Sequence, residues 1–145
     1  MMKPSINVAL IFTLALLFPS FGCRAQEKLH QFDVKMVNVG STEITGVKVY
    51  FGKTFVRGGY LRKGIKSVSV GYETDNSRIT KIEYSKGEGW STHVVEQLDI
   101  PLQLNPHAKD ELVVISIDGS SGGIDVYVTT RAKELEKEKD EKERK

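Results

Sequence analysis

The residues that could carry covalent catalysis lie in one short stretch of the sequence. Ser91, His93 and Asp99 supply a hydroxyl, an imidazole and a carboxylate, which are the groups of a nucleophilic triad. On an extended strand, however, these side chains would follow one another along one face, about 6–7 Å apart for every two residues, and could not converge. The sequence also has no G-x-S-x-G turn to present a nucleophile. We therefore expect no catalytic residues and no enzymatic activity.

The sequence also argues against a phosphate-binding loop, a metal centre and a bound cofactor. Gly52-Lys53-Thr54 has the form of the end of a phosphate-binding loop, but Val47 stands where that motif needs a glycine. The histidines are widely spaced and form no H-x-x-x-H pair: His30, His93 and His107. We therefore expect no metal ligands and no cofactor-binding residues.

A basic segment is the main candidate for a binding surface. No acidic residue lies between Glu43 and Glu73, and the interval also contains several aromatic residues. Such a segment could bind an anionic surface, such as lipopolysaccharide, phospholipid headgroups or an acidic protein. Alternatively, the cations line the solvent face of a hairpin whose aromatic residues point inward. The candidate binding residues are Lys53, Arg57, Arg62, Lys63 and Lys66.

The single tryptophan is a second candidate contact residue. Trp90 follows Gly87-Glu88-Gly89, where a loop enters an expected strand. A tryptophan here either packs in the core, which is the commoner arrangement, or is exposed as an anchor for a partner or a glycan. The sequence leaves both alternatives open.

Residues 1–25 have the pattern of an export signal. Lys3 precedes an apolar run that ends at Phe18 and is shorter than the ~20 residues of a membrane-spanning helix. Cys23-Arg24-Ala25 offers a cleavage site before Gln26, whereas Ser20-Phe21-Gly22-Cys23 resembles the lipobox of bacterial lipoproteins. That resemblance implies lipidation of Cys23. Both alternatives stay open, and both predict a chain that is periplasmic or anchored at the cell envelope.

The opposite end of the sequence, residues 131–145, is almost entirely charged. It contains seven basic and six acidic residues, and its apolar residues are Ala132 and Leu135. Because this composition provides no apolar stripe to bury, we expect a solvated tail that is either a fluctuating helix or disordered.

The remaining body, residues 26–130, alternates between apolar and polar residues, the pattern of half-buried β-strands. Leu112–Ile117 is a nearly continuous apolar run, which predicts a strand buried on both faces. Pro101 indicates an edge strand or a bulge. The expected strands include 32–36, 47–51, 68–72, 80–84, 94–104, 112–117 and 124–128. We predict an all-β domain, an immunoglobulin-like sandwich of about seven antiparallel strands, with a small β-barrel as the alternative.

The export signal, the strand pattern and segments such as Val47-Lys48-Val49-Tyr50-Phe51-Gly52 resemble small exported bacterial β-sandwich proteins. The resemblance implies a fold and a location, and it supplies no catalytic residues. We therefore expect a non-enzymatic envelope protein with a binding or structural accessory role, whose partner is an envelope macromolecule or a protein. Nucleic acid is not expected as a partner because the chain is predicted to be exported, and membrane contact is expected only through the lipid anchor.

Two other functions remain as alternatives. The chain could be a periplasmic inhibitor or immunity protein that inserts residues 58–64 or 87–90 into the cleft of a hydrolase or toxin. An enzyme of unknown type has the least support, because the sequence shows no catalytic arrangement. The identity of the ligand and the oligomeric state are not encoded in any pattern that we find.

Overall fold

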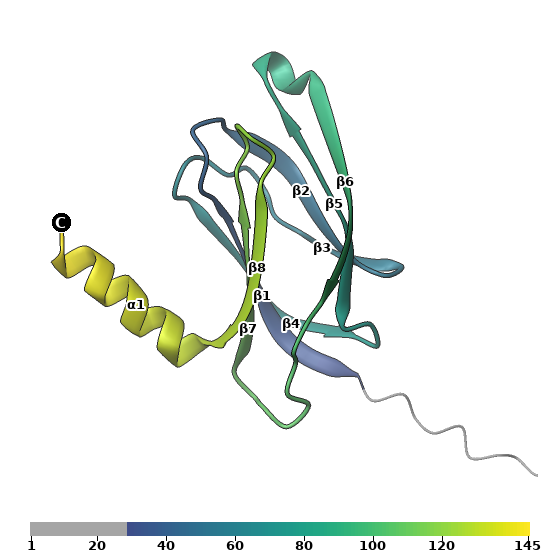
Figure 1. The fold of residues 1–145 in the computed structure, drawn as a ribbon, viewed down its shortest axis with the longest axis vertical. Coiled ribbons are helices and arrows are strands. Elements are labelled where there is room, and N and C mark those ends of the chain that lie inside the picture. Colours follow the sequence, from purple (N-terminus) through teal and green to yellow (C-terminus); the bar gives the residue numbers. More distant parts are fainter. Residues whose placement is uncertain (1–28) are drawn as a thin grey trace, which may run out of the picture.

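Two four-stranded β-sheets form the body of the protein (Figure 1). The structure, a computed structural model, describes residues 29–145, without the side chains of residues 68–70. The first sheet has the strand order β4-β1-β7-β8 and the second sheet has the order β3-β2-β5-β6. The predicted export signal and Cys23 lie outside the described residues.

Turns and loops join consecutive strands. β5 and β6 are joined by a single 3-10 turn, η2 (Glu88–Trp90), and β8 leads directly into the helix α1 (Arg131–Glu143). The strands are β1 (His30–Asn38), β2 (Ile44–Phe51), β3 (Thr54–Arg57), β4 (Lys66–Thr74), β5 (Arg78–Lys86), β6 (Thr92–Pro101), β7 (Glu111–Ile117) and β8 (Ile124–Thr130).

The prediction of a mostly β body is confirmed, and the strands form two separate sheets. The structure contains all seven expected strands and, in addition, β3, which pairs with β2 across the turn at Gly52-Lys53. The prediction that every pair is antiparallel was wrong, because β1 and β7 run parallel with Asp33 beside Leu112. Alternation of apolar and polar residues specifies which face a residue occupies, but it does not specify the direction of the neighbouring strand.

The hydrophobic core lies between the two sheets. On β2, Val47, Val49 and Phe51 are almost inaccessible to solvent, as alternation requires. At one end, the ring of Phe51 from the second sheet contacts Phe32 and Tyr72 of the first sheet, at centroid distances of 5.5 and 5.0 Å. These three rings therefore join the sheets by aromatic packing.

Two details of the strands agree with the sequence analysis. β7 is buried on both faces, since Leu112 and Val114 on its outer face are buried as well as Val113 and Ile115, which point into the core. Pro101 is the last residue of β6, and β6 is an edge strand of the second sheet. A proline is tolerated there because an edge strand has one side without a hydrogen-bonded neighbour.

The charged tail begins with a helix whose first two turns are attached to the first sheet. Residues 131–143 form α1, in which Glu134 is buried and binds both the ammonium group of Lys35 and the hydroxyl of Tyr127. Glu138 accepts hydrogen bonds from Lys35, at 2.9 Å, and from Lys66. Charged side chains, rather than an apolar stripe, therefore attach this helix to the sheet.

The attachment of α1 is expected to weaken in acid. The ammonium groups of Lys66 and Lys35 lower the pKa of Glu138 from 4.5 to about 2. Burial alone would raise the pKa of Glu134, but its hydrogen bond and charge interaction with Lys35 lower it. Because both pKa values are depressed in the folded protein, their stabilising contribution is present above pH 4.5 and is lost as the pH falls toward 2.

Amide hydrogen exchange of α1 between pH 5 and pH 2 measures this effect after correction for the intrinsic exchange rate. We expect the protection of α1 to decrease over this interval while the strands stay protected. The variant Glu138→Gln is the control, because it should show a weaker pH dependence. A protection of α1 that does not change with pH would contradict the role assigned to these ion pairs.

Candidate functional site

Aromatic and cationic side chains share the outer face of the second sheet. Lys48 and Tyr50 of β2 point outward because Val47 and Val49 between them point into the core. The strand register places Tyr50 beside Phe55 of β3 on one side. The outward side chains of these two consecutive strands are thereby brought into one surface.

The pairing of β2 with β5 on one side and β3 on the other adds further side chains to this surface. Tyr50 has Lys81 of β5 as its other neighbour, while Lys48 lies between Arg57 of β3 and Glu83 of β5. We use the name cationic aromatic face for the outward side chains that form this surface: Lys48, Tyr50, Phe55, Arg57 and Lys81.

Contacts with the aromatic rings hold the cations of this face in place. The rings of Tyr50 and Phe55 pack at a centroid distance of 5.1 Å. The guanidinium group of Arg57 lies 5.3 Å from the centre of the Phe55 ring, and the ammonium group of Lys48 lies 5.7 Å from it. The ammonium group of Lys81 lies 3.9 Å from the centre of the Tyr50 ring. Each such contact contributes about 0.5–1 kcal/mol at an exposed site and fixes the direction of the charge.

The charge of the cationic aromatic face is only partly neutralised. Glu83 accepts hydrogen bonds from Lys81, at 2.6 Å, and from the hydroxyl of Tyr50, at 3.0 Å, and it lies 3.9 Å from Lys48. The hydrogen bond from Lys81 lowers the pKa of Glu83, which keeps it ionised. Arg57 forms no ion pair among the described residues. The face therefore presents positive charge that no acidic residue in the described part of the chain balances.

A second aromatic pair lies at the tip of the β5–β6 hairpin. The rings of Trp90 and Tyr60 meet edge to face at a centroid distance of 5.5 Å, and each residue is 40% exposed. The guanidinium group of Arg62 lies 5.5 Å from the centre of the Tyr60 ring and 3.7 Å from the carboxylate of Glu43. The alternative in which Trp90 packs in the core is therefore wrong. Its side chain is exposed and can contact a binding partner.

The structure divides the basic residues that the sequence grouped together. Arg57 lies on the cationic aromatic face, and Lys53 is exposed in the turn that precedes β3. Arg62 belongs to the cluster around Tyr60. Lys63 is exposed, and its backbone pairs with that of Asn38 at the end of β1. Lys66 lies on β4 of the first sheet and pairs with Glu138. The five candidate residues therefore do not lie together in one patch.

Of the cationic aromatic face, the sequence analysis named only Arg57 as a candidate, and the two cations that it left out are Lys48 and Lys81. Lys48 could have been found from alternation alone, because it lies between the inward-facing Val47 and Val49. Lys81 could not be found in this way, because only the pairing of β5 with β2 places it beside Tyr50. The alternative in which all aromatic residues of the basic segment point inward is also wrong, since Phe55 is 37% exposed.

The residues considered for catalysis do not converge. Ser91 and His93 are exposed, and Asp99 pairs with Arg78 at 2.6 Å. Among the described residues, the ring of His93 makes one hydrogen bond, of 3.4 Å, with the hydroxyl of Ser85. Within residues 29–145 no group of three or more histidine, cysteine or acidic side chains is arranged to hold a metal ion.

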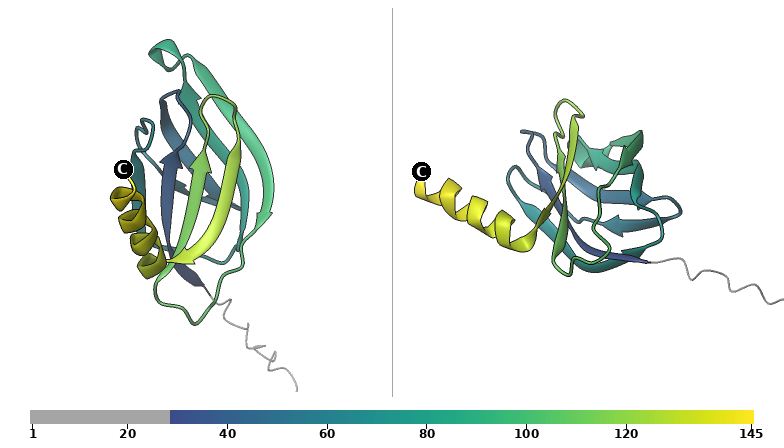
Figure 2. Two further views of the ribbon diagram at one scale, coloured as in Figure 1. Left: turned by 60° about the vertical axis from the view of Figure 1, so that its left-hand side comes forward. Right: turned by 60° about the horizontal axis from the view of Figure 1, so that its bottom comes forward.

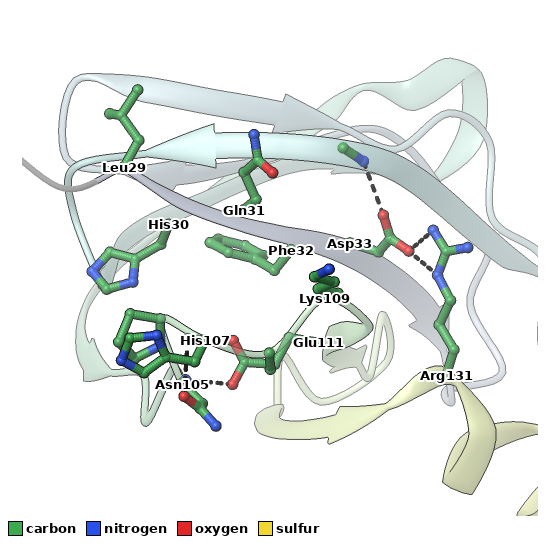
Figure 3. A pocket seen from close by; sticks show the side chains of 13 residues that line it. Leu29, His30, Gln31, Phe32, Asp33, Asn105, His107, Lys109, Glu111 and Arg131 are labelled. Atoms are coloured by element: carbon green, nitrogen blue, oxygen red, sulfur yellow. Dashed lines mark hydrogen bonds and ion pairs between the residues drawn. The ribbon is translucent and has the colours of Figure 1, made fainter.

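A hollow of about 550 Å³ with mixed polar and apolar walls lies between the start of β1, the loop before β7 and the start of α1 (Figure 3). His30 and His107 line one side of it, and Asp33 and Arg131 lie on the other. Asp33 is bound by Arg131 and by the backbone N–H of Gly71, at 2.9 Å. Because the chain's own donors already occupy this carboxylate, the hollow is a weaker candidate site than the cationic aromatic face.

Comparisons with known proteins add no functional assignment. No protein-family model matches the chain, and a search of curated proteins found no match. The NMR structure of a protein from Eubacterium rectale is similar, with a TM-score of 0.38 and 14% identity over 70% of this chain and 89% of that chain. A likeness at that score carries no argument about fold or function. Among the described residues, no helix is long and apolar enough to cross a membrane.

Proposed function

We propose that this chain is a non-enzymatic binding protein of the cell envelope that holds an acidic polysaccharide on the cationic aromatic face. The observation that carries the proposal is the position of Arg57. Its guanidinium group lies 5.3 Å above the Phe55 ring and has no acidic partner among the described residues. A guanidinium group held in this way presents a planar set of donors that suits a carboxylate.

The shape of the surface favours an extended polymer over a compact ligand. Phe55 and Arg57 lie on either side of the inward-facing Val56 of β3, so their side chains follow one another at about 6–7 Å, and Lys53 is exposed in the turn just before this strand. Beyond Arg57, the chain continues to the exposed Tyr60 and Arg62. A polymer that lies along this edge can place carboxylates beside the cations and sugar C–H groups against the aromatic rings.

The location and the finer fold class belong to the same proposal. The signal pattern of residues 1–25 supports export, and the lipobox resemblance supports anchoring through Cys23. The two sheets that share a core support an immunoglobulin-like sandwich. An exported chain would meet acidic polysaccharides at the envelope.

Replacing Arg57 with serine is expected to reduce the affinity for polygalacturonate by roughly 10- to 100-fold, because a hydrogen bond to a charged group contributes about 1.5–3 kcal/mol. Isothermal titration of the processed chain with polygalacturonate measures this loss. The matched control is Lys63→Ser, which removes the same charge from an exposed residue that lies off the face. That variant should bind as the native chain does.

Any one of three outcomes would contradict binding of an acidic polysaccharide. The first is that the native chain does not bind polygalacturonate, and the second is that it binds uncharged dextran equally well. The third is that Arg57→Ser and Lys63→Ser reduce the affinity for polygalacturonate by the same factor. The third result would mean that binding depends on net charge alone, and binding would then also fall uniformly with salt.

A periplasmic inhibitor is the second candidate function, and the position of Trp90 favours it. The β5–β6 hairpin projects beyond the other strands and ends in the turn η2 (Figure 1). Trp90 is 40% exposed there, and exposed tryptophans often dominate the binding energy of an interface. Stoichiometric capture of one hydrolase from an envelope extract, abolished in Trp90→Ala but kept in Arg57→Ser, would favour the inhibitor over the polysaccharide-binding protein.

A further inference from the structure

The two sheets have four edge strands, and three of these carry features that hinder pairing with another chain. β3 is only four residues long. β4 contains Gly71, at a φ of 72°, where its register with β1 shifts. β6 ends in Pro101, and its Glu96 lies opposite the core residue Ile82 and so faces inward.

β8 carries none of these features. Its seven residues pair with β7 without a shift of register, and they include no proline, glycine or lysine. Ile124, Val126 and Val128 face the core but remain only half-buried, and a hollow of about 490 Å³ lies beside the last two. The free edge of β8 therefore combines unpaired backbone groups with apolar side chains that are not fully covered.

The helix that follows β8 leaves this edge open. α1 begins at the end of β8, but its ion pairs with Lys35 of β1 and Lys66 of β4 draw it across the outer face of the first sheet, away from the edge (Figure 2). A strand from another molecule can thus approach β8 without displacing α1.

We propose that β8 pairs with β8 of a second copy of this chain, antiparallel and about a two-fold axis at Tyr127. This register sets Val126 opposite Val128 of the partner subunit and makes one continuous sheet from the first sheets of two molecules. A two-fold interface must be complementary to itself, and an antiparallel pair of identical strands meets that condition.

The charges at the two ends of β8 are complementary in this arrangement. Asp125 lies near the start of β8, and Lys133 lies just beyond its end, beside the same hollow as Thr129. Both residues are exposed, and neither forms an ion pair within the part of the chain that the structure describes. Antiparallel pairing sets Asp125 opposite Thr129 of the partner subunit and so brings it to the Lys133 of the partner subunit, at two symmetric places. This match favours a second copy over an unrelated peptide strand.

Sedimentation equilibrium of the processed chain at low salt tests the proposal with a charge swap. The native chain should form a dimer. Asp125→Lys and Lys133→Glu should each weaken the dimer by about tenfold or more, because like charges then face one another across the interface. The double variant with both substitutions should recover the native affinity, because it restores opposite charges with the signs exchanged.

Asp75→Lys is the matched control, because it makes the same charge change at an exposed residue between β4 and β5, and it should leave the dimer unchanged. A native chain that stays monomeric at millimolar concentration would overturn the proposal. So would a dimer that neither single variant weakens, or a double variant no tighter than the singles. Binding of polygalacturonate uses the second sheet and is measured separately, so either proposal can fail without the other.

Discussion

Replacing Asn38 with alanine is expected to lower the free energy of unfolding by about 3 kcal/mol or more, because each buried polar group that loses its partner costs about 1–3 kcal/mol. The Asn38 side chain is inaccessible to solvent and lies at the end of β1. Its amide nitrogen donates hydrogen bonds to the carbonyl oxygens of Thr42, at 2.7 Å, and Leu61, at 3.0 Å. Its amide oxygen accepts one from the N–H of Gly40, at 3.1 Å. This one side chain thus joins two loops to the first sheet.

Urea unfolding followed by far-ultraviolet circular dichroism measures the change. The control is Asn105→Ala, which removes a side chain of the same type from an exposed turn, where its oxygen accepts a hydrogen bond from the N–H of His107 at 3.0 Å. We expect that control to cost less than about 1 kcal/mol, since solvent replaces the lost partner. Equal costs for Asn38→Ala and Asn105→Ala would refute the role assigned to the buried amide.

Replacing Phe51 with alanine is expected to destabilise the protein by about 3–5 kcal/mol, the range for deleting a buried aromatic ring. Phe51 is 1% exposed, and its ring contacts Phe32 and Tyr72 across the interface of the two sheets. Its loss would leave a cavity where these rings join the sheets, and the rigid strands around it can collapse only partly.

Phe55→Ala is the natural control for this experiment. It deletes the same side chain from the outer face of the neighbouring strand, where the ring is 37% exposed. The lost ring packing and cation contacts should cost about 1 kcal/mol. Phe55→Ala should weaken polygalacturonate binding while leaving the fold intact, whereas Phe51→Ala should mainly lower the stability. If Phe55→Ala were as destabilising as Phe51→Ala, the assignment of the two faces would be wrong.

These two phenylalanines show what alternation can establish. Val47, Val49 and Phe51 share one parity, and that pattern alone predicts an inward-facing set. β3 was not predicted because the strand that follows the turn at Gly52-Lys53 has only four residues, which is too few to show a clear period of two. The parallel pairing of β1 with β7 was not predicted, because periodicity contains no information about which strand is adjacent.

The candidate site was predicted in part for the same reason. Arg57 and Trp90 are exposed, as a contact residue must be. The ring beneath Arg57 belongs to Phe55 on the same strand, whereas the ring beside Trp90 belongs to Tyr60, which only the fold brings close. Lys66 was placed in the wrong surface because its partner, Glu138, lies 72 residues later and is reached only in three dimensions. The burial of Glu134 had no local signal either, since it depends on Lys35, 99 residues away.

The parallel pair also determines when the first sheet can form. Asp33 and Leu112 are neighbours although 79 positions separate them. β1 therefore cannot pair with β7 until nearly the whole chain has been synthesised. A topology with so many distant pairings has a high contact order and folds in milliseconds to seconds rather than microseconds. A nascent polypeptide that stops before Glu111 would leave Val34 and Met36 without the strand that completes their sheet, and it should be bound by chaperones or aggregate.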